Sequence, residues 1–178
     1  MTLYEILTVD DVIKSINENL DYLLELIPEI KNMIGFQHNN PDHHLDVWKH
    51  TLLALSLSSC DFDIRLALLL HDIGKPFSYQ DDGDIRHFKD HSKLSSEIAR
   101  KILKRLSFDD NYIDYISYLI RHHDYPISNK EIEEKYNLCL KLYEIQKCDM
   151  LAHNPDALDK RKEYLKKIGN KLFYKVAL

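Results

Sequence analysis

The sequence predicts an all-α fold, and three observations support this. Apolar residues recur at helical spacing along nearly the whole chain. The 178 residues include only four glycines and five prolines, too few for a fold built on many tight turns. With 44% apolar residues the chain can bury a sizeable core, and no repeat or low-complexity segment divides it. We therefore expect one compact helical domain over residues 1–178.

The N-terminal part is predicted to form one long amphipathic helix. A capping pair, Thr8 with Asp11, precedes an apolar face that continues to Ile27, where Pro28 interrupts or kinks the helix. Residues 35–45 are polar and contain Asn40-Pro41-Asp42, which is typical of a loop.

The rest of the chain repeats the pattern of amphipathic stretches and polar connections. Further helices are expected at about 47–57 (after an Asp46 N-cap), 64–70, 91–106, 111–123 and 138–152. A loop or lid is expected at 77–90. A capping box, Ser128 to Glu131, begins a short helix, and Asn154-Pro155 begins the last helix with proline in its first turn.

Charge and cysteine usage restrict the classes of function. The formal charge of −5 argues against a general nucleic-acid binder and leaves RNA ends as the only nucleic-acid partner to consider. Three cysteines without a CxxC motif suit a reducing cytosol. The sequence shows neither a signal-peptide pattern nor an apolar run of membrane-spanning length, so we expect a cytoplasmic protein without membrane attachment.

The pentapeptide His71-Asp72-Ile73-Gly74-Lys75 carries the clearest chemical signal. It follows five apolar residues, where a carboxylate is costly to bury unless it has a partner. An imidazole beside a carboxylate offers a divalent cation two ligands. Gly74 is expected to let the chain leave the helix in a conformation that a side chain would oppose. Lys75 is a mobile point charge suited to a phosphate oxygen.

Other histidines and one acid lie near the ends of predicted helices, where neighbouring helices of a bundle can bring them together. The first site would then consist of His50, His71, Asp72 and Asp149. A second site would add His91 and His123, with Asp72 bridging the two. Imidazole and carboxylate ligands suit one or two transition metal ions, namely Fe, Mn, Co, Ni or Zn.

Simpler interpretations remain open for each of these positions. A histidine at a helix start is commonly solvated or a cap, His122-His123 could be favoured by the helix dipole, and Asp149 could be a surface acid. Spacing alone does not decide between these interpretations and metal binding.

Several further residues are candidates for contact with a substrate. His43 and His44 precede the His50 helix, and Arg121 could pair with a phosphate or be a solvated cation at a helix end. The general acid is not identified; Asp90, His87 and His122 are the candidates. His38 and His153 are expected at the surface.

Together these motifs resemble the HD-domain metal-dependent phosphohydrolase superfamily. The H…HD…D signature is matched by His50, His71-Asp72 and Asp149, and HDIGKP at 71–76 resembles the HDIG subgroup. The sequence is most similar to the HD domain attached to some bacterial tRNA nucleotidyltransferases, the CCA-adding enzymes. The stretches that carry this likeness are 40–52, 87–91 and 119–123, within a motif-bearing part of about 36–153.

The resemblance implies metal binding by His50, His71, Asp72, His91, His123 and Asp149. From the chemistry of the residues themselves, catalytic roles are expected for Asp72 and Lys75, and substrate contacts for Lys75, Arg121, His44 and His122. His123 rather than His122 is favoured as the ligand, from the Ile-Arg-x-His pattern.

Two departures qualify the resemblance. The 178 residues contain no nucleotidyltransferase segment, so CCA addition is not implied. Asp90 stands where a glycine is expected before His91, which could perturb the second site.

The expected reaction is hydrolysis of a phosphoester in a small nucleotide-like substrate, either a phosphomonoester or a 2′,3′-cyclic phosphodiester, by metal-activated water. A close variant is cleavage of a dinucleoside polyphosphate. The alternative from a different class is a non-catalytic domain that binds metal and nucleotide and reports to a partner. A di-iron oxygenase ranks last, because Lys75 suits a phosphate.

Overall fold

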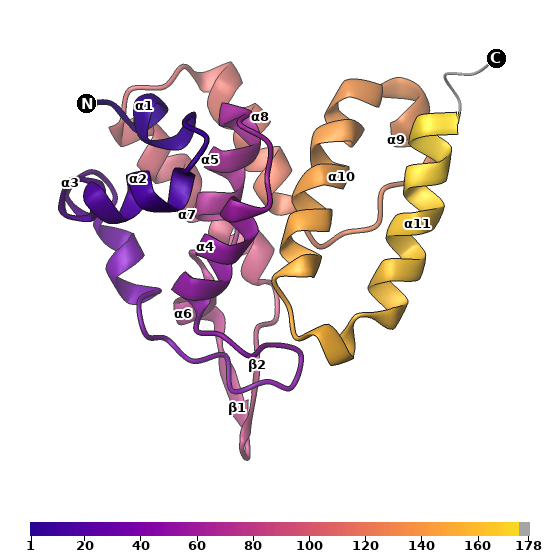
Figure 1. The fold of residues 1–178 in the computed structure, drawn as a ribbon, viewed down its shortest axis with the longest axis horizontal. Helices are drawn as coiled ribbons and strands as arrows, with labels where there is room; N and C mark the ends of the chain where they lie inside the picture. Colours follow the sequence, from indigo (N-terminus) through magenta and orange to yellow (C-terminus); the bar gives the residue numbers. More distant parts are fainter. Residues whose placement is uncertain (175–178) are drawn as a thin grey trace.

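The computed structural model describes residues 1–174, so the last four residues of the predicted 1–178 domain lie outside the described part. Helices dominate this part, and the predicted all-α class is confirmed (Figure 1). No helix within residues 1–174 combines the length and apolar character needed to cross a membrane.

The elements in chain order are α1 (Leu3–Leu7), α2 (Val12–Glu18), α3 (Leu20–Leu26), the 3₁₀ helix η1 (Pro28–Asn32), α4 (Val47–Ser56), α5 (Phe62–Leu70), α6 (Lys75–Ser78), β1 (Gln80–Asp82), β2 (Ile85–His87), α7 (His91–Arg105), α8 (Asp110–Arg121), α9 (Asn129–Glu134), α10 (Tyr136–Leu151), the 3₁₀ helix η2 (Pro155–Ala157) and α11 (Asp159–Tyr174).

The predicted single N-terminal helix is wrong, because several local signals divide it. A capping box of Thr2 with Glu5 begins α1, and Thr8 ends that helix rather than beginning the next one. Asp11 caps α2, which ends at Asn19, and Pro28 begins η1 instead of kinking a continuous helix. Each short helix still turns an apolar side into the core, which explains the continuous helical periodicity of the sequence.

Helix α5 runs through the interior and delivers its C-terminal end to the centre of the molecule. Its side chains from Ile64 to Leu70 are all buried, including Arg65 at 2% exposure. Arg65 donates hydrogen bonds to the backbone oxygens of Leu7 (2.7 Å) and Val9 (2.6 Å), which ties the α1–α2 connection to α5. His71 and Asp72 therefore lie in the protein interior, directly beyond a buried helix.

The segment predicted as a loop at 77–90 contains the end of α6 and a small antiparallel hairpin of β1 and β2. Gly83 has a φ of +62° in the turn, where glycine is favoured. At the base of the hairpin, the Arg86 guanidinium lies over the rings of Phe36 (4.8 Å) and Tyr79 (4.5 Å). The hairpin, which projects downward in Figure 1, is thereby attached to the loop before α4.

The last part of the chain forms a helical pair beside the central helices. Helix α10 packs against α4 and α5 on one side and against α11 on the other (Figure 1). The capping box of Ser128 and Glu131 begins α9 as predicted. The predicted start of the last helix is wrong, because Asn154 caps the short η2 and α11 begins only at Asp159.

Candidate metal centre

The glycine of the pentapeptide is required by packing and not by its backbone conformation. Gly74 has a φ of −83°, which any residue adopts, so the expectation of a conformation that a side chain opposes is wrong. A Cβ at this position would lie 2.6 Å from the backbone nitrogen of Ser95 and 2.9 Å from the backbone oxygen of His91. Gly74 therefore permits the close approach of α7 that places His91 beside the end of α5.

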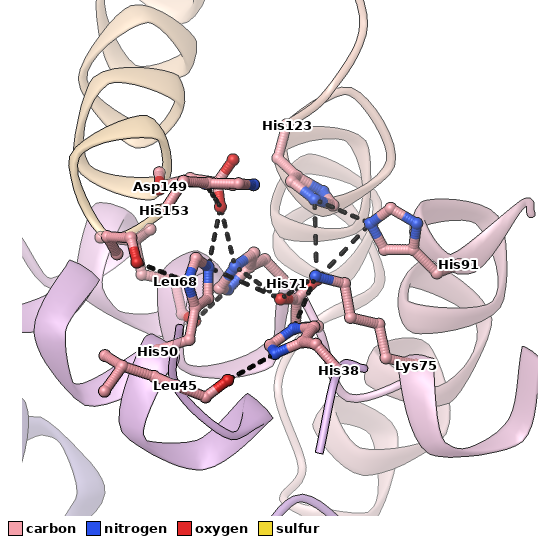
Figure 2. Close-up of polar contacts among 12 residues, drawn as sticks. His38, Leu45, His50, Leu68, His71, Lys75, His91, His123, Asp149 and His153 are labelled. Atoms are coloured by element: carbon pink, nitrogen blue, oxygen red, sulfur yellow. Dashed lines mark hydrogen bonds and ion pairs between the residues drawn. The ribbon is translucent and has the colours of Figure 1, made fainter. Parts of the chain in front are cut away.

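The first histidine–carboxylate group joins α4, the end of α5 and α10. His50 Nε2 lies 2.9 Å from Asp149 Oδ1 and 3.7 Å from Asp72 Oδ2. His71 Nε2 lies 3.3 Å from Asp72 Oδ2 and 3.5 Å from Asp149 Oδ1. Figure 2 shows His50 and His71 side by side beneath Asp149, with their rings directed toward its carboxylate.

The second group uses the other oxygen of Asp72. Asp72 Oδ1 lies 3.5 Å from His91 Nε2 at the start of α7 and 3.9 Å from His123 Nε2 after α8. The two imidazole nitrogens are 3.3 Å apart. The carboxylate of Asp72 thus presents Oδ2 to one group and Oδ1 to the other.

Backbone carbonyls orient all four imidazole rings in the same way. In each ring Nδ1 donates to a carbonyl oxygen, at 2.7–3.1 Å, in the pairs His50–Ala152, His71–Leu68, His91–Phe88 and His123–Ile120. Because a carbonyl can only accept, Nδ1 carries the proton and Nε2 offers a lone pair when the ring is neutral. The carbonyls therefore fix the tautomer and aim every Nε2 at the carboxylates, as in metal sites whose ligands are held by an outer hydrogen bond.

The residues present fit a divalent cation. His71 Nε2 and both Asp72 carboxylate oxygens are buried and take part in no hydrogen bond of regular geometry, and such atoms in a native core require an explanation. The donor atoms of His50, His71 and Asp72 lie within 4.8 Å of one another, as do those of Asp72, His91 and His123. Imidazole with carboxylate is the donor set of a transition metal site.

The electrostatics of the cluster favour the ionised form of its two carboxyl groups. Burial disfavours the charged form of His71, yet the carboxylates of Asp72 and Asp149 raise its pKa to about 10. Burial likewise opposes ionisation of Asp72, but His71 and Lys75 hold the pKa of its carboxyl well below the usual range. Lys75 Nζ lies 2.8 Å from Asp72 Oδ2. The lowered pKa values of Asp72 and Asp149 keep both acids ionised, as carboxylate ligands of a metal ion must be.

A cavity of about 670 Å³ opens onto the cluster. It is lined by side chains from both halves of the molecule: Asp42, His43, Lys75, Phe88, His91, His123, Asp149, His153, Asp156, Ala157, Leu158, Asp159, Lys160 and Arg161. The candidate ligands His91, His123 and Asp149 are thus accessible to a small molecule.

Sequence reasoning missed three residues beside the cluster. His38 and His153, expected at the surface, are 1% and 8% exposed. His38 Nε2 lies 3.1 Å from Lys75 Nζ, and Arg161 Nη1 lies 3.2 Å from Asp149 Oδ2. His153 follows Asp149 by four residues, a spacing that places both on one helix face and could have indicated it. No sequence signal indicates His38 or Arg161.

The structure does not bring three of the predicted substrate contacts to the cavity. His44 is exposed, and neither it nor Arg121 lines the cavity. The His122 ring stacks on Tyr118 with centroids 3.9 Å apart, while His123 is the neighbour that faces Asp72. The positions of His44, Arg121 and His122 therefore give no support to substrate binding by them.

Asp90 has a left-handed conformation, with a φ of +58°. This explains why a glycine is expected there, since glycine adopts that conformation without a Cβ penalty. Asp90 does not displace the next residue, because His91 still faces Asp72.

Comparison with known proteins places these features in a family. The sequence matches the HD domain family over residues 42–167. It is 32% identical over 113 residues to the CC-adding tRNA nucleotidyltransferase of Thermus thermophilus, covering 60% of this chain and 26% of that protein. It is 33% identical over 109 residues to the A-adding tRNA nucleotidyltransferase of Deinococcus radiodurans, covering 57% and 25%.

A more distant relative is a bifunctional uridylyltransferase/uridylyl-removing enzyme of Cereibacter sphaeroides, 27% identical over 133 residues, with 62% of this chain and 13% of that protein covered. The matches to these three relatives span about a quarter of their length or less.

Proposed function

The chain belongs to the HD domain family, and on that basis we propose that it is a metal-dependent phosphohydrolase acting on a phosphoester of a nucleotide-like substrate. The substrate is a phosphomonoester or a 2′,3′-cyclic phosphodiester. The observation that carries the proposal is the orientation of the cluster: Asp72 presents one oxygen to each group, and every imidazole turns Nε2 inward.

In this proposal His50, His71, Asp72 and Asp149 hold one divalent cation, and Asp72, His91 and His123 hold a second. The donor set admits Fe, Mn, Co, Ni or Zn. Cations bound there would supply Lewis-acid polarisation of a phosphoryl oxygen and lower the pKa of water so that it attacks near neutral pH.

Lys75 is the residue proposed to bind the reacting phosphoryl group. Its ammonium is held in place on two sides, at 2.8 Å from Asp72 Oδ2 and 3.1 Å from His38 Nε2. Lys75 also lines the cavity, so its charge is fixed where negative charge develops on the phosphoryl oxygens. Positioning before the reaction avoids the cost of reorganising the site during it.

The cavity itself suits a nucleotide. Its volume of about 670 Å³ lies within the range of small-molecule sites. Phe88 contributes an aromatic wall, with its ring centroid 5.4 Å from Lys75 Nζ. The names of the relatives concern nucleotidyl groups, and uridylyl removal cleaves a phosphoester, which supports the same substrate class. We further propose that the chain forms a single domain and works in the cytoplasm.

The test begins with elemental analysis of protein purified without added metal. A panel of nucleoside monophosphates, 2′,3′-cyclic nucleotides, a dinucleoside polyphosphate and an RNA oligonucleotide with a cyclic phosphate end follows, with Mn²⁺, Co²⁺ or Ni²⁺. Turnover that is lost in Asp72→Asn and kept in Asp84→Asn, an acid in the exposed hairpin turn, would support the proposal.

Tight nucleotide binding without turnover by metal-loaded protein would instead favour the non-catalytic binding domain. Iron content with colour and oxygen consumption would favour an oxygenase.

A further inference from the structure

A row of nitrogen-bearing side chains lies beside the cavity, beyond the proposed metal ligands, and all of its members except the buried His38 line the cavity. It begins at Lys75, whose Nζ lies 3.1 Å from His38 Nε2. His38 stacks on His43 with centroids 3.7 Å apart, and His43 meets His153 at 4.2 Å. Arg161 Nη1 lies 2.8 Å from His153 Nε2 and ends the row. The two permanent cations, Lys75 and Arg161, thus lie at the two ends of a row of three imidazole rings.

The two ends of the row are built alike. Lys75 pairs with Asp72 at 2.8 Å, and Arg161 pairs with Asp149 at 3.2 Å. Both carboxylates are proposed metal ligands. A cation shared with these carboxylates would offset their negative charge, so that the positive charges of Lys75 and Arg161 could act on an anion in the cavity.

The Arg161 end of the row has unused hydrogen-bonding capacity. His43 Nδ1 is buried and has no hydrogen-bond partner. Within residues 1–174 Arg161 makes contacts only through Nη1, which leaves Nε and Nη2 without a hydrogen bond. Both residues line the cavity. An arginine fork with free donors is suited to binding a phosphate by two hydrogen bonds.

A third metal ion is the competing occupant, because donor atoms of His43, His50 and His153 lie within 4.8 Å of one another. Two contacts disfavour it. His50 Nδ1 donates to the backbone oxygen of Ala152, and Nε2 faces Asp149. Arg161 Nη1 lies within 3.1 Å of both ring nitrogens of His153, where its charge repels a cation. The exposed acids Asp42, Asp156 and Asp159 also line the cavity, but water screens them.

We infer that His43, His153 and Arg161 form a second phosphate subsite, and that the substrate therefore carries a second phosphoryl group besides the one bound at Lys75. This inference rests on the proposed function, which supplies the first phosphate position. A cavity of about 670 Å³ accommodates a nucleoside bisphosphate.

The test compares adenosine 3′,5′-bisphosphate with adenosine 3′-monophosphate and adenosine 5′-monophosphate. Calorimetry with Mn²⁺ at 4 °C gives Kd, and hydrolysis at 25 °C gives KM and kcat. The bisphosphate is expected to bind about tenfold more tightly than either monophosphate, as one charge-assisted phosphate contact would provide. Arg161→Gln should reduce this preference to within twofold, and Arg161→Lys should keep part of it. Lys162→Gln, the neighbouring exposed cation of α11, should leave it unchanged.

Equal affinity for bisphosphate and monophosphates, equal weakening of all three by Arg161→Gln, or no nucleotide binding would each overturn the inference. A thermal unfolding scan of each variant separates loss of fold from loss of the subsite. The proposed function fails independently, since turnover can be absent while the Arg161-dependent preference in Kd remains. Turnover without that preference would support the proposed hydrolase activity and contradict the second phosphate subsite.

Discussion

His91 and His123 direct their Nε2 atoms at each other across 3.3 Å, while Nδ1 of each ring donates to a backbone carbonyl. Two neutral rings held in this way would oppose lone pair to lone pair. Burial, together with the charge of His71, lowers the pKa of His123 to about 4, so protonation of that ring is disfavoured near neutral pH. A metal ion held by His91, His123 and Asp72 would remove this conflict.

The number of bound metal ions should therefore depend on these two rings. The double variant His91→Gln/His123→Gln is expected to bind one divalent ion where the unaltered protein binds two, because His50, His71 and Asp149 remain. Elemental analysis after loading with Mn²⁺ and desalting measures the ratio. His122→Gln is the matched control, because its ring stacks on Tyr118 away from the cluster. An unchanged ratio in the double variant would exclude a second site at this position.

Replacement of Gly74 by alanine should destabilise the protein and reduce its metal content. The new Cβ would approach the backbone nitrogen of Ser95 to 2.6 Å, so α7 must move. Overpacking of this kind costs about 1–3 kcal/mol in the free energy of unfolding. Urea denaturation measures the loss. Adding Ser95→Ala should not restore stability, because the closest contact is with the backbone; full restoration would show that the side chain was responsible.

Asp90→Gly should stabilise the protein. Asp90 has a φ of +58° and its side chain makes no capping hydrogen bond for α7, so glycine relieves strain without losing a contact. We expect a gain of about 0.5–1 kcal/mol in the free energy of unfolding. Urea denaturation of metal-free protein measures it. Ser107→Gly, at a φ of +62°, serves as a comparison at a site remote from the cluster. A loss of stability in Asp90→Gly would show that its carboxylate has a role that the contacts do not reveal.

Arg65 should be among the most sensitive positions outside the cluster. Its guanidinium is buried and donates to the backbone oxygens of Leu7 and Val9, which Arg65→Met would leave unpaired. The expected cost is about 2–4 kcal/mol in the free energy of unfolding. Arg100→Met removes an exposed ion pair with Asp114 and should cost less than about 1 kcal/mol. Similar costs for both variants would contradict the role assigned to the buried hydrogen bonds.

Acid should weaken the contact between α5 and α10. Burial alone would raise the pKa of Asp61, but its hydrogen bonds to Lys141 (2.8 and 2.9 Å) and the Ile64 backbone lower it. A lowered pKa gives stability that is present above the unfolded-state value of about 4 and is lost as the pH falls through the folded-state value.

Asp61→Asn tests this contact, because asparagine keeps the N-cap of α5 and removes the charge. The variant should be less stable than the unaltered protein by about 0.5–1 kcal/mol at pH 7, and the difference should shrink below about pH 4. Urea midpoints at pH 7 and pH 3 measure this. A stability difference between the two proteins that does not change with pH would instead show that Asp61 acts mainly as the N-cap of α5.

The parts of the fold that follow from local signals could be predicted from the sequence. Asp46 caps α4 and Ser128 begins α9 because each side chain bonds a backbone amide three residues later. The convergence of Asp149 on His50 depends on how distant helices pack. Their places near the ends of predicted helices suggested it, and the family resemblance decided in its favour. The burial of His38 likewise depends on a loop that folds back onto Lys75, which no local pattern encodes.

The boundaries of the N-terminal helices, by contrast, are local features that the sequence did not predict. Their apolar periodicity is continuous, yet the backbone breaks at Thr8 and Asn19, where competing caps are individually weak signals. Gly74 shows that a residue type can be correctly singled out for the wrong physical reason, because the space around it depends on α7.

The candidate ligands come from segments that are far apart along the chain, since His50 and Asp149 are 99 residues apart. An ion that holds both would act as a reversible cross-link closing a very long loop, without any cysteine being involved. Release of the ion should then be coupled to separation of the α10–α11 pair from helices α4 and α5. Resistance to a protease would follow the occupancy of the site, and starving cells of transition metals would shorten the lifetime of the polypeptide as well as suppress its chemistry.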